Sequence, residues 1–364
     1  MNAPTTAPAP ITEYLQGNAG SIPAEGILQD FAAVLKPTDG EHIVQKFGPK
    51  LLIEETDKVA QGFFEYSRCC GNRKALLVGI NYIGTDNELR GCINDARNMQ
   101  KFIIDRFGFS NDNIVLLTDD TKDPGLKPTK ANIVKYMQWL VKDAKKDDAL
   151  FFHYSGHGTQ VRDRVLDEPD KKDEAICPLD FPEVGMFIDD DSTHEQLVKP
   201  LPAGCRLTAV FDSCNSGSVM DIPYVYQPDK KDPIKEPKIL HVQHGVLHSL
   251  LQPLGQLVQG LDKTEHKIFD PARSMQIMSH AGASPADVVC WSGCLDTQTS
   301  ADTFENGQNV GALSWAFITS LTKDPTQTYM ELLVSIRALL KQKYTQIVQL
   351  SSCHPIDTNL EFVA

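Results

Sequence analysis

The sequence predicts an α/β fold with a mainly parallel central sheet. Short apolar runs, such as residues 74–82 and 148–156, alternate along the chain with longer segments whose apolar residues recur at helical spacing. Short strands separated by helices of about 15 residues form parallel pairs joined by crossovers. Such sheets carry helices on both faces.

The predicted elements follow in a regular order. Residues 74–82 form an apolar run typical of a strand, and residues 89–108 carry apolar residues at helical spacing. The same criteria predict further strands at 113–119, 148–156, 205–214, 286–294, 347–352 and 358–363, and further helices at 129–146, 311–321 and 329–342.

Composition changes along the chain divide it into four parts. Residues 1–70 start with a Pro/Ala/Thr-rich arm and predict a leader or prodomain. Residues 71–223 hold the regular strand and helix alternation and predict a large subdomain. Residues 224–272, rich in Pro and Lys at first and then in Leu and Gln, predict a surface insertion or linker. Residues 273–364 predict a smaller subdomain.

The bulk composition excludes several classes of function. A net charge of −13 argues against a large phosphate-binding surface and against nucleic-acid partners, and favours cations or basic peptides. No stretch reaches the roughly 18 apolar residues of a membrane span. We expect a monomer in the cytoplasm, with the nucleus as an alternative.

The cysteines do not indicate a disulfide framework or a zinc finger. They form an odd set, and only Cys290 and Cys294 come close to the spacing of a metal-ligand pair. The nine positions are 69, 70, 92, 177, 205, 214, 290, 294 and 353.

Two segments at predicted strand ends carry the chemistry. His157 stands between two glycines in YSGHGTQ, and Cys214 stands in FDSCNSGS. In parallel sheets, the carboxyl ends of strands form the active site. A thiolate nucleophile with an imidazole within reach is the arrangement of a thiol protease. Backbone N–H groups of Gly158 and Cys214 are candidates for the oxyanion hole.

Each residue alone has a simpler interpretation. A lone loop histidine usually has no catalytic role, and a cysteine after a buried strand is usually an inert core thiol. Both stand at strand ends beside glycines, which favours the catalytic pair.

The ordered motifs resemble those of type I, short-linker metacaspases, most like those of fungi and protozoa. The resemblance covers about residues 66–364. It includes KALLVGINY, ELRGCINDARN, FFHYSGHGTQ, FIDDD, LTAVFDSCNSGSVMD, SGCLDTQTSAD, GALSWAF and LSSCHPIDTNLEF. It implies a caspase-like α/β/α sandwich, Cys/His catalysis, cleavage after Arg or Lys, and activation by calcium. One departure is Asn215, where the family normally has His after the nucleophile.

The resemblance also implies a substrate pocket. Asp95 and Asp212 would supply the charge that binds a basic P1 side chain, with Ser155 and Cys92 lining the wall. An acidic pocket would repel the aspartyl substrates of true caspases. The alternative is that both aspartates only cap adjacent turns.

A calcium site is implied in the same way, at Asp173, Asp189, Asp190 and Asp221. Carboxylates are ligands that Ca²⁺ prefers, and Asp221 follows Cys214 closely enough for the metal to order the catalytic loop. The alternative is a solvated acidic loop.

Self-processing is a further expectation. The segment QPDKKDPIKEPK offers basic residues to an Arg/Lys-specific protease, although such charge runs are often only solvated. The candidate cleavage sites are Lys230, Lys231, Lys235 and Lys238.

Two rival functions stay open at this point. One is a calcium-responsive scaffold or aggregate-handling protein with an attenuated protease site, suggested by Asn215. The other is a legumain-like or separase-like hydrolase, which the QTSAD motif and the aspartates disfavour. The family association with cell death, stress and protein quality control does not choose a pathway.

Overall fold

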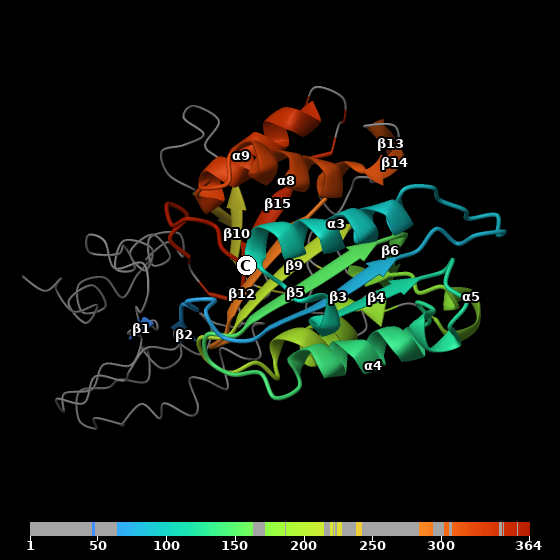
Figure 1. Ribbon diagram of the computed structural model, residues 1–364, viewed down its shortest axis with the longest axis horizontal. Helices are drawn as coiled ribbons and strands as arrows, with labels where there is room; N and C mark the ends of the chain where they lie inside the picture. Colours follow the sequence, from blue (N-terminus) through green and yellow to red (C-terminus); the bar gives the residue numbers. More distant parts are fainter. Residues whose placement is uncertain are drawn as a thin grey trace, which may run out of the picture.

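The computed structural model is centred on an eight-stranded sheet with helices on both faces, which confirms the predicted α/β fold (Figure 1). Among the residues that the structure describes, no helix is long and apolar enough to cross a membrane. The structure describes residues 46–47, 64–162, 172–185, 187–214, 219–220, 222, 224–227, 238–241, 284–293, 302–305, 308–341, 344, 346–354 and 356–364.

The middle of the sheet is parallel and one edge is antiparallel. The strand order is β11-β10-β15-β12-β9-β5-β3-β4. The parallel strands are β3 (Arg73–Gly79), β4 (Ile114–Thr118), β5 (Ala149–Ser155), β9 (Arg206–Asp212) and β12 (Asp287–Ser292). The antiparallel strands are β15 (Gln349–Ser352), β10 (Tyr224–Gln227) and β11 (Lys238–His241).

Two helical layers cover the sheet (Figure 1). One face carries α3 (Cys92–Phe107), α8 (Ala312–Lys323) and α9 (Tyr329–Lys341). The other carries α4 (Lys130–Val141) and the π-helical segment η3 (Asp189–Val198). Short helical turns are η1 (Asn111–Asn113), η2 (Pro124–Leu126) and α5 (Phe181–Val184).

Three small sheets complete the structure. The first joins β6 (Gly158–Arg162), β7 (Lys172–Ile176) and β8 (Phe187–Ile188), and follows directly on β5. The second pairs β13 (Asp302–Glu305) with β14 (Gln308–Gly311), and the third pairs β1 (Lys46–Phe47) with β2 (Phe64–Glu65).

Helix boundaries follow local sequence chemistry. Helix α3 ends where Gly108 adopts a left-handed conformation, φ 72°, and its N–H reaches the carbonyls of Ile103 and Ile104. Helix α4 begins after Thr129, whose side chain accepts a hydrogen bond from Asn132 N–H.

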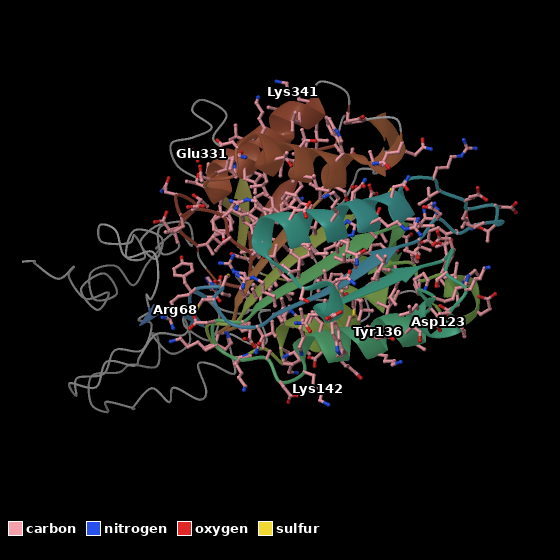
Figure 2. The ribbon with its side chains drawn as sticks, viewed as in Figure 1. Arg68, Asp123, Tyr136, Lys142, Glu331 and Lys341 are labelled. Carbon is pink, nitrogen blue, oxygen red and sulfur yellow. The ribbon has the colours of Figure 1, made fainter. Side chains whose placement is uncertain are left out.

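Strand alternation produces two separate cores. In β5, Phe151 faces α3 and α8, whereas Phe152 faces the α4 side. The period of two therefore also assigns His153 and Ser155 to the α3 and α8 face. Charged side chains such as Lys142, Glu331 and Lys341 point away from the sheet into solvent (Figure 2).

Two regions differ from the sequence expectations. Residues 358–363 form no strand, because Phe362 packs into the core and only Glu361 makes an isolated bridge, with Thr328. Strands β10 and β11 lie within the predicted insertion 224–272 and extend the sheet edge.

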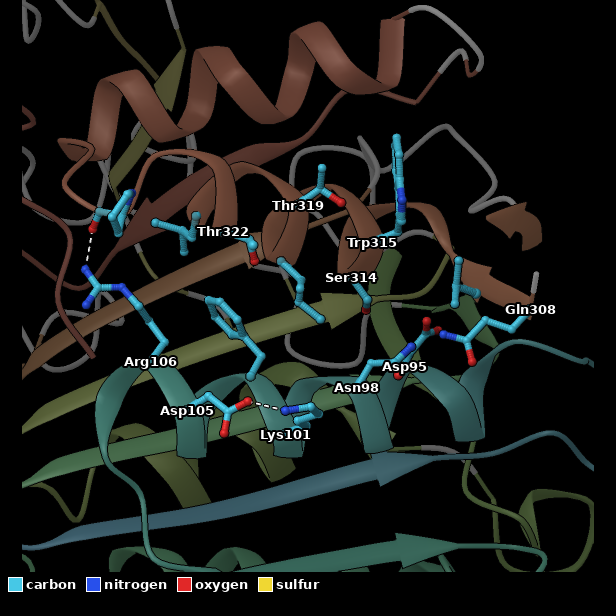
Figure 3. A pocket seen from close by; sticks show the side chains of 15 residues that line it. Asp95, Asn98, Lys101, Asp105, Arg106, Gln308, Ser314, Trp315, Thr319 and Thr322 are labelled. Atoms are coloured by element: carbon cyan, nitrogen blue, oxygen red, sulfur yellow. Dashed lines mark hydrogen bonds and ion pairs between the residues drawn. The ribbon is translucent and has the colours of Figure 1, made fainter. Parts of the chain in front are cut away.

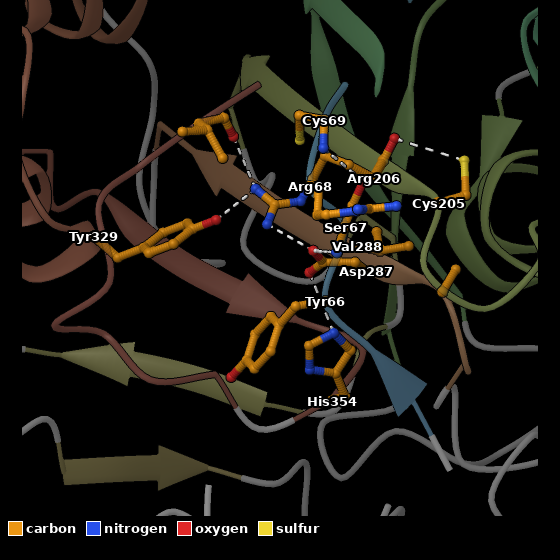
Figure 4. A network of polar contacts seen from close by, with 12 residues as sticks. Tyr66, Ser67, Arg68, Cys69, Cys205, Arg206, Asp287, Val288, Tyr329 and His354 are labelled. Atoms are coloured by element: carbon orange, nitrogen blue, oxygen red, sulfur yellow. Dashed lines mark hydrogen bonds and ion pairs between the residues drawn. The ribbon is translucent and has the colours of Figure 1, made fainter. Parts of the chain in front are cut away.

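A buried ion pair joins distant parts of the chain at the amino ends of β9 and β12 (Figure 4). Arg206 and Asp287 have exposed side-chain fractions of 3% and 0%, and Arg206 Nη2 donates to Asp287 Oδ2 at 2.6 Å. Arg206 also donates to the Tyr329 hydroxyl and to the Val363 carbonyl. Asp287 accepts the Ser67 N–H at 2.9 Å. The pair therefore ties the start of the catalytic region and the C-terminal tail to the sheet.

The pair also sets the charge of Asp287. Burial alone would raise the pKa of this carboxyl, but the Arg206 guanidinium, with help from His354 3.2 Å away, lowers the pKa from 3.8 to about 2. The pKa of Asp287 is lower in the folded protein than in the unfolded chain. The stability that its ionised form contributes is therefore fully present above pH 3.8 and is lost as the pH falls toward 2.

We predict that Asp287→Asn lowers the free energy of unfolding by about 3–5 kcal/mol, because it leaves the Arg206 guanidinium buried without its counter-ion. Denaturant unfolding measures this. The matched control is Lys199→Ala, which breaks the exposed pair with Glu195 and should cost less than about 1 kcal/mol. Equal, small effects of both substitutions would contradict the role of the buried pair.

Candidate active site

Three neighbouring strands end in register at one edge of the sheet. Gly79 of β3 pairs with Ser155 of β5, and Ser155 pairs with Asp212 of β9. His157 and Cys214 each stand two residues beyond Ser155 and Asp212, respectively. The two strand-end segments predicted from the sequence are therefore side by side.

The His157 ring is held by a backbone carbonyl and an aromatic ring. Its Nε2 lies 2.8 Å from the carbonyl oxygen of Asn87. A carbonyl only accepts, so Nε2 carries a proton, and in the neutral imidazole Nδ1 is the free base. The ring lies over Tyr82, with centroids 4.7 Å apart and the planes tilted by 38°.

Two buried tyrosines anchor the His157 backbone. His157 N–H donates to the Tyr82 hydroxyl at 3.0 Å, and that hydroxyl donates to the Cys177 carbonyl at 2.6 Å. The Tyr154 hydroxyl lies 2.8 Å from the His157 carbonyl, which also accepts the Cys177 N–H at 3.1 Å. Burial raises the pKa of both tyrosines, so both hydroxyls keep their protons at neutral pH. These hydrogen bonds fix the backbone of His157 and so restrict where its imidazole can lie.

The Gly158 backbone packs directly against Cys214. A Cβ on Gly158 would collide with the Cys214 carbonyl oxygen and lie 3.2 Å from Ser213 Cβ. Only glycine allows this approach. Cys214 is partly exposed, whereas neighbouring Cys177 is 3% exposed. Burial, and secondarily the nearby Cys214, raises the pKa of Cys177 to about 12, so Cys177 stays a protonated thiol.

Three residues of the expected P1 pocket, Asp95, Ser155 and Asp212, are connected near the carboxyl ends of β5 and β9, and the fourth, Cys92, precedes Asp95 in α3. Cys92 and Asp95 stand one turn apart at the start of α3. Asp95 accepts a hydrogen bond from the Ser155 hydroxyl at 2.7 Å, and Asp212 accepts the Ser314 N–H at 2.7 Å. The exposed fractions of Asp95 and Asp212 are 1% and 3%.

Gly311, the residue before α8, lies between these two carboxylates. Its N–H donates to both oxygens of Asp95, at 2.8 and 2.9 Å. A Cβ there would collide with Asp212 Oδ2 and lie 2.7 Å from Asp95 Oδ2. The structure therefore brings the two aspartates to one place, at the amino end of α8.

A pocket of about 510 Å³ lies behind this cluster, between α3 and α8 (Figure 3). Asp95 and Ser314 lie at one end, and Phe102 and Trp315 contribute apolar walls. Neither His157 nor Cys214 lines it.

The expected calcium ligands can be placed only through their backbone. Asp173 lies in β7, and Asp189 and Asp190 begin η3; their side chains lie outside the described residues, as does all of Asp221. Asn215 and the candidate self-cleavage sites Lys230, Lys231 and Lys235 also lie outside them, and Lys238 is placed by its backbone in β11.

Several site residues were not predicted from the sequence. Asn87 acts through its carbonyl, which no side-chain pattern reveals. Tyr82 closes the first predicted strand, and Tyr154 and His153 stand inside another, where they were indistinguishable from core residues. Gly311 belongs to GALSWAF, a motif that contributed to the family resemblance but suggested no role for the glycine.

Comparisons with known proteins agree with this geometry. The family model "Metacaspase, peptidase C14 domain" matches residues 73–223. Metacaspase-1 of Cryptococcus neoformans var. neoformans serotype D (strain JEC21) is 47% identical over 338 residues, covering 91% of this chain and 72% of that protein. Metacaspase-1 of Kluyveromyces lactis is 49% identical over 329 residues, covering 87% and 74%.

Two solved structures are also similar to the chain. Protein GSU0716 from Geobacter sulfurreducens, at 23% identity, aligns over 80% of this chain and 98% of its own, with a TM-score of 0.49. Caspase-1 from Spodoptera frugiperda, at 11% identity, aligns over 86% and 96%, with a TM-score of 0.44. On the strength of the two curated relatives and the matching domain, the chain belongs to the metacaspase family of cysteine peptidases.

Proposed function

We propose that this cysteine peptidase is a calcium-activated endopeptidase that cleaves after Arg or Lys. The observation that carries the specificity is the pair of buried carboxylates, Asp95 and Asp212, gathered at Gly311 beneath the strand ends that bear His157 and Cys214. A guanidinium or ammonium group is the chemical partner that such a site favours.

The proposed mechanism uses the two nitrogens of His157 differently. Nε2–H stays bonded to the Asn87 carbonyl, while Nδ1 takes the proton from the Cys214 thiol. The thiolate attacks the scissile carbonyl carbon, and the protonated Nδ1 then donates to the leaving amine. Water hydrolyses the resulting thioester. The N–H groups of Gly158 and Cys214 are the proposed oxyanion donors.

The backbone arrangement supports a calcium site at the predicted aspartates. β7 and β8 are antiparallel, with Ala175 opposite Ile188, so Asp173 in β7 lies near the start of η3, which contains Asp189 and Asp190. His194 Nδ1, in η3, is 3.1 Å from the carbonyl of Met220. Asp221 follows Met220 in the sequence and itself lies outside the described residues. A bound cation would supply the positive charge that offsets the repulsion between neighbouring carboxylates.

Self-processing and cellular role complete the proposal. The segment between β10 and the edge strand β11 contains Lys230, Lys231 and Lys235, which suit the proposed specificity. Lys238 pairs with Gln227, so a cut there requires the edge strand to detach first. A role in cell death, stress or protein quality control, in the cytoplasm or nucleus, rests on the family resemblance alone.

The first prediction concerns the dyad. Cys214→Ala should abolish cleavage of Arg-terminated fluorogenic peptides without changing the thermal unfolding curve, because it removes the proposed nucleophile from a partly exposed position. His157→Ala should do nearly the same. Cys70→Ala, at an exposed cysteine, is the matched control and should retain activity. A Cys214→Ala protein that retained substantial activity would favour another nucleophile.

The second prediction concerns P1 selection. Asp212→Asn should raise KM for Arg substrates by roughly 10- to 100-fold, corresponding to about 1.5–3 kcal/mol for a hydrogen bond to a charged group. The thermal unfolding temperature should stay close to that of the wild type. Asp147→Asn alters a carboxylate bonded to Arg68 just before β5, at the other end of that strand, and should leave KM unchanged. Unchanged kinetics of the Asp212→Asn enzyme would remove Asp212 from the pocket.

The third prediction concerns calcium. Calcium should switch the enzyme on in roughly the 10⁻⁵ to 10⁻³ M range of weaker carboxylate sites, and magnesium should substitute poorly because it requires near-ideal octahedral geometry. Asp190→Ala should abolish the calcium response and reduce calcium binding measured by calorimetry. Glu195→Ala, at an exposed acidic residue of the same segment, is the matched control. Full activity in chelator would contradict the proposal.

A further inference from the structure

We propose that the amino end of α8, through Gly311 and Ser314 with His153 behind it, positions the two P1-binding carboxylates and determines the preference for Arg over Lys. This inference rests on the proposed assignment of Asp95 and Asp212 to the P1 pocket. It adds residues from the C-terminal region of the chain, more than 90 positions beyond Asp212, to that site.

The first turn of α8 donates directly to both carboxylates. Gly311 N–H reaches both oxygens of Asp95, and Ser314 N–H reaches Asp212 Oδ2. The first N–H groups of a helix lack partners within the helix and carry partial positive charge. Hydrogen bonds from these N–H groups fix the positions of the carboxylate oxygens of both aspartates before a substrate side chain arrives.

Gly311 is required for space and not for its backbone conformation. Its φ of −75° and ψ of 145° are accessible to any L-amino acid. A Cβ, however, would collide with Asp212 and approach Asp95 to 2.7 Å. A side chain at this position would push apart the two carboxylates that must bind one guanidinium.

His153 connects α8 to the strand that also supports Asp95. Its side chain is 0% exposed, and its Nε2 lies 3.0 Å from the Ser314 hydroxyl oxygen. Its Nδ1 has no hydrogen-bond partner in the described part of the chain, and burial lowers the pKa to about 3, so the ring stays neutral. Ser314 is thus its one polar anchor among these residues.

Strand β5 therefore sets the spacing of the two carboxylates. His153 and Ser155 lie on the same face, two positions apart. Ser155 donates to Asp95, while His153 contacts Ser314, whose N–H donates to Asp212. One strand thus braces both halves of the pocket, one directly and one through α8.

Accurate spacing matters more for Arg than for Lys. The guanidinium presents its N–H groups in a planar fork that needs acceptors at set positions, whereas the lysine ammonium is a compact charge on a flexible stem. Loosening the first turn of α8 should therefore weaken Arg binding more than Lys binding.

The test compares KM and kcat of Ser314→Ala with those of the wild type, on peptides that differ only in Arg or Lys at P1. Ser314→Ala keeps the N–H that donates to Asp212 and removes the hydroxyl that contacts His153. We expect KM for Arg to rise roughly two- to tenfold, the factor that corresponds to losing one neutral hydrogen bond, with little change in kcat. KM for Lys should rise less. Ser314→Thr, which keeps the hydroxyl, should restore the Arg preference.

Two controls separate positioning from general destabilisation. Ser320→Ala makes the same change on the same helix, at a side chain 2% exposed and bonded to Gln327 and Ser335, and should not alter the Arg to Lys ratio. In an Asp212→Asn background, Ser314→Ala should add little, because the hydroxyl acts on P1 binding only through the position of the N–H that Asp212 accepts. Thermal unfolding of each variant shows whether it is folded.

Two results would overturn the inference: KM values of Ser314→Ala that are unchanged, or that rise by the same factor for Arg and Lys. An undiminished effect of Ser314→Ala in the Asp212→Asn background would also overturn it. A wild-type enzyme without preference for basic P1 residues would overturn the proposed function itself, and this inference with it. The wild-type measurement alone gives that result, so failure of the proposed function can be distinguished from failure of this inference.

Discussion

The in-register parallel pairing of β3, β5 and β9 is the constraint on which the active site depends. Ser155 and Asp212 are register partners, so the two chains leave the sheet at the same level. His157 and Cys214 stand two residues further on in each chain and are brought together by the turns. A slip of one residue in β5 or β9 would move Ser155 or Asp212 to the opposite face of the sheet and disrupt the proposed P1 pocket. The catalytic geometry is therefore a consequence of backbone hydrogen bonding in the core.

Buried charge is handled differently at the two ends of this sheet. At the amino end, Asp287 is paired with Arg206, a full positive charge from the protein itself, which makes the pair a structural tie. At the carboxyl end, Asp95 and Asp212 accept hydrogen bonds from N–H and O–H groups of Gly311, Ser314 and Ser155. Hydrogen bonds to charged acceptors are among the stronger ones in proteins. Buried carboxylates thus form a structural tie at the amino end, and at the carboxyl end they are the groups proposed to bind a basic substrate side chain.

The sequence predicted the fold well where local pattern determines structure. The apolar run at 74–82 corresponds to β3, and the helical spacing at 89–108 corresponds to α3. The proximity of the His157 and Cys214 segments was predictable because both residues follow apolar strands, and parallel strands bring their carboxyl ends together. His153 was not, because its role depends on Ser314, 161 positions away. Strands β6, β7 and β8 were missed as well, since they are short, lie outside the main sheet and lack a continuous apolar run.

The central claim, that buried carboxylates beneath a Cys/His dyad select a basic P1 side chain, is tested most directly by an unbiased cleavage profile. The calcium-supplemented enzyme would digest a pool of peptides with free choice of sequence, and mass spectrometry would identify each new terminus, with the Cys214→Ala protein as the blank. The account predicts cuts after Arg and Lys, with Arg preferred because its planar fork matches two fixed carboxylates. Enzyme-dependent cuts after Asp or after apolar residues would contradict it, because Asp95 and Asp212 would then not form the P1 pocket.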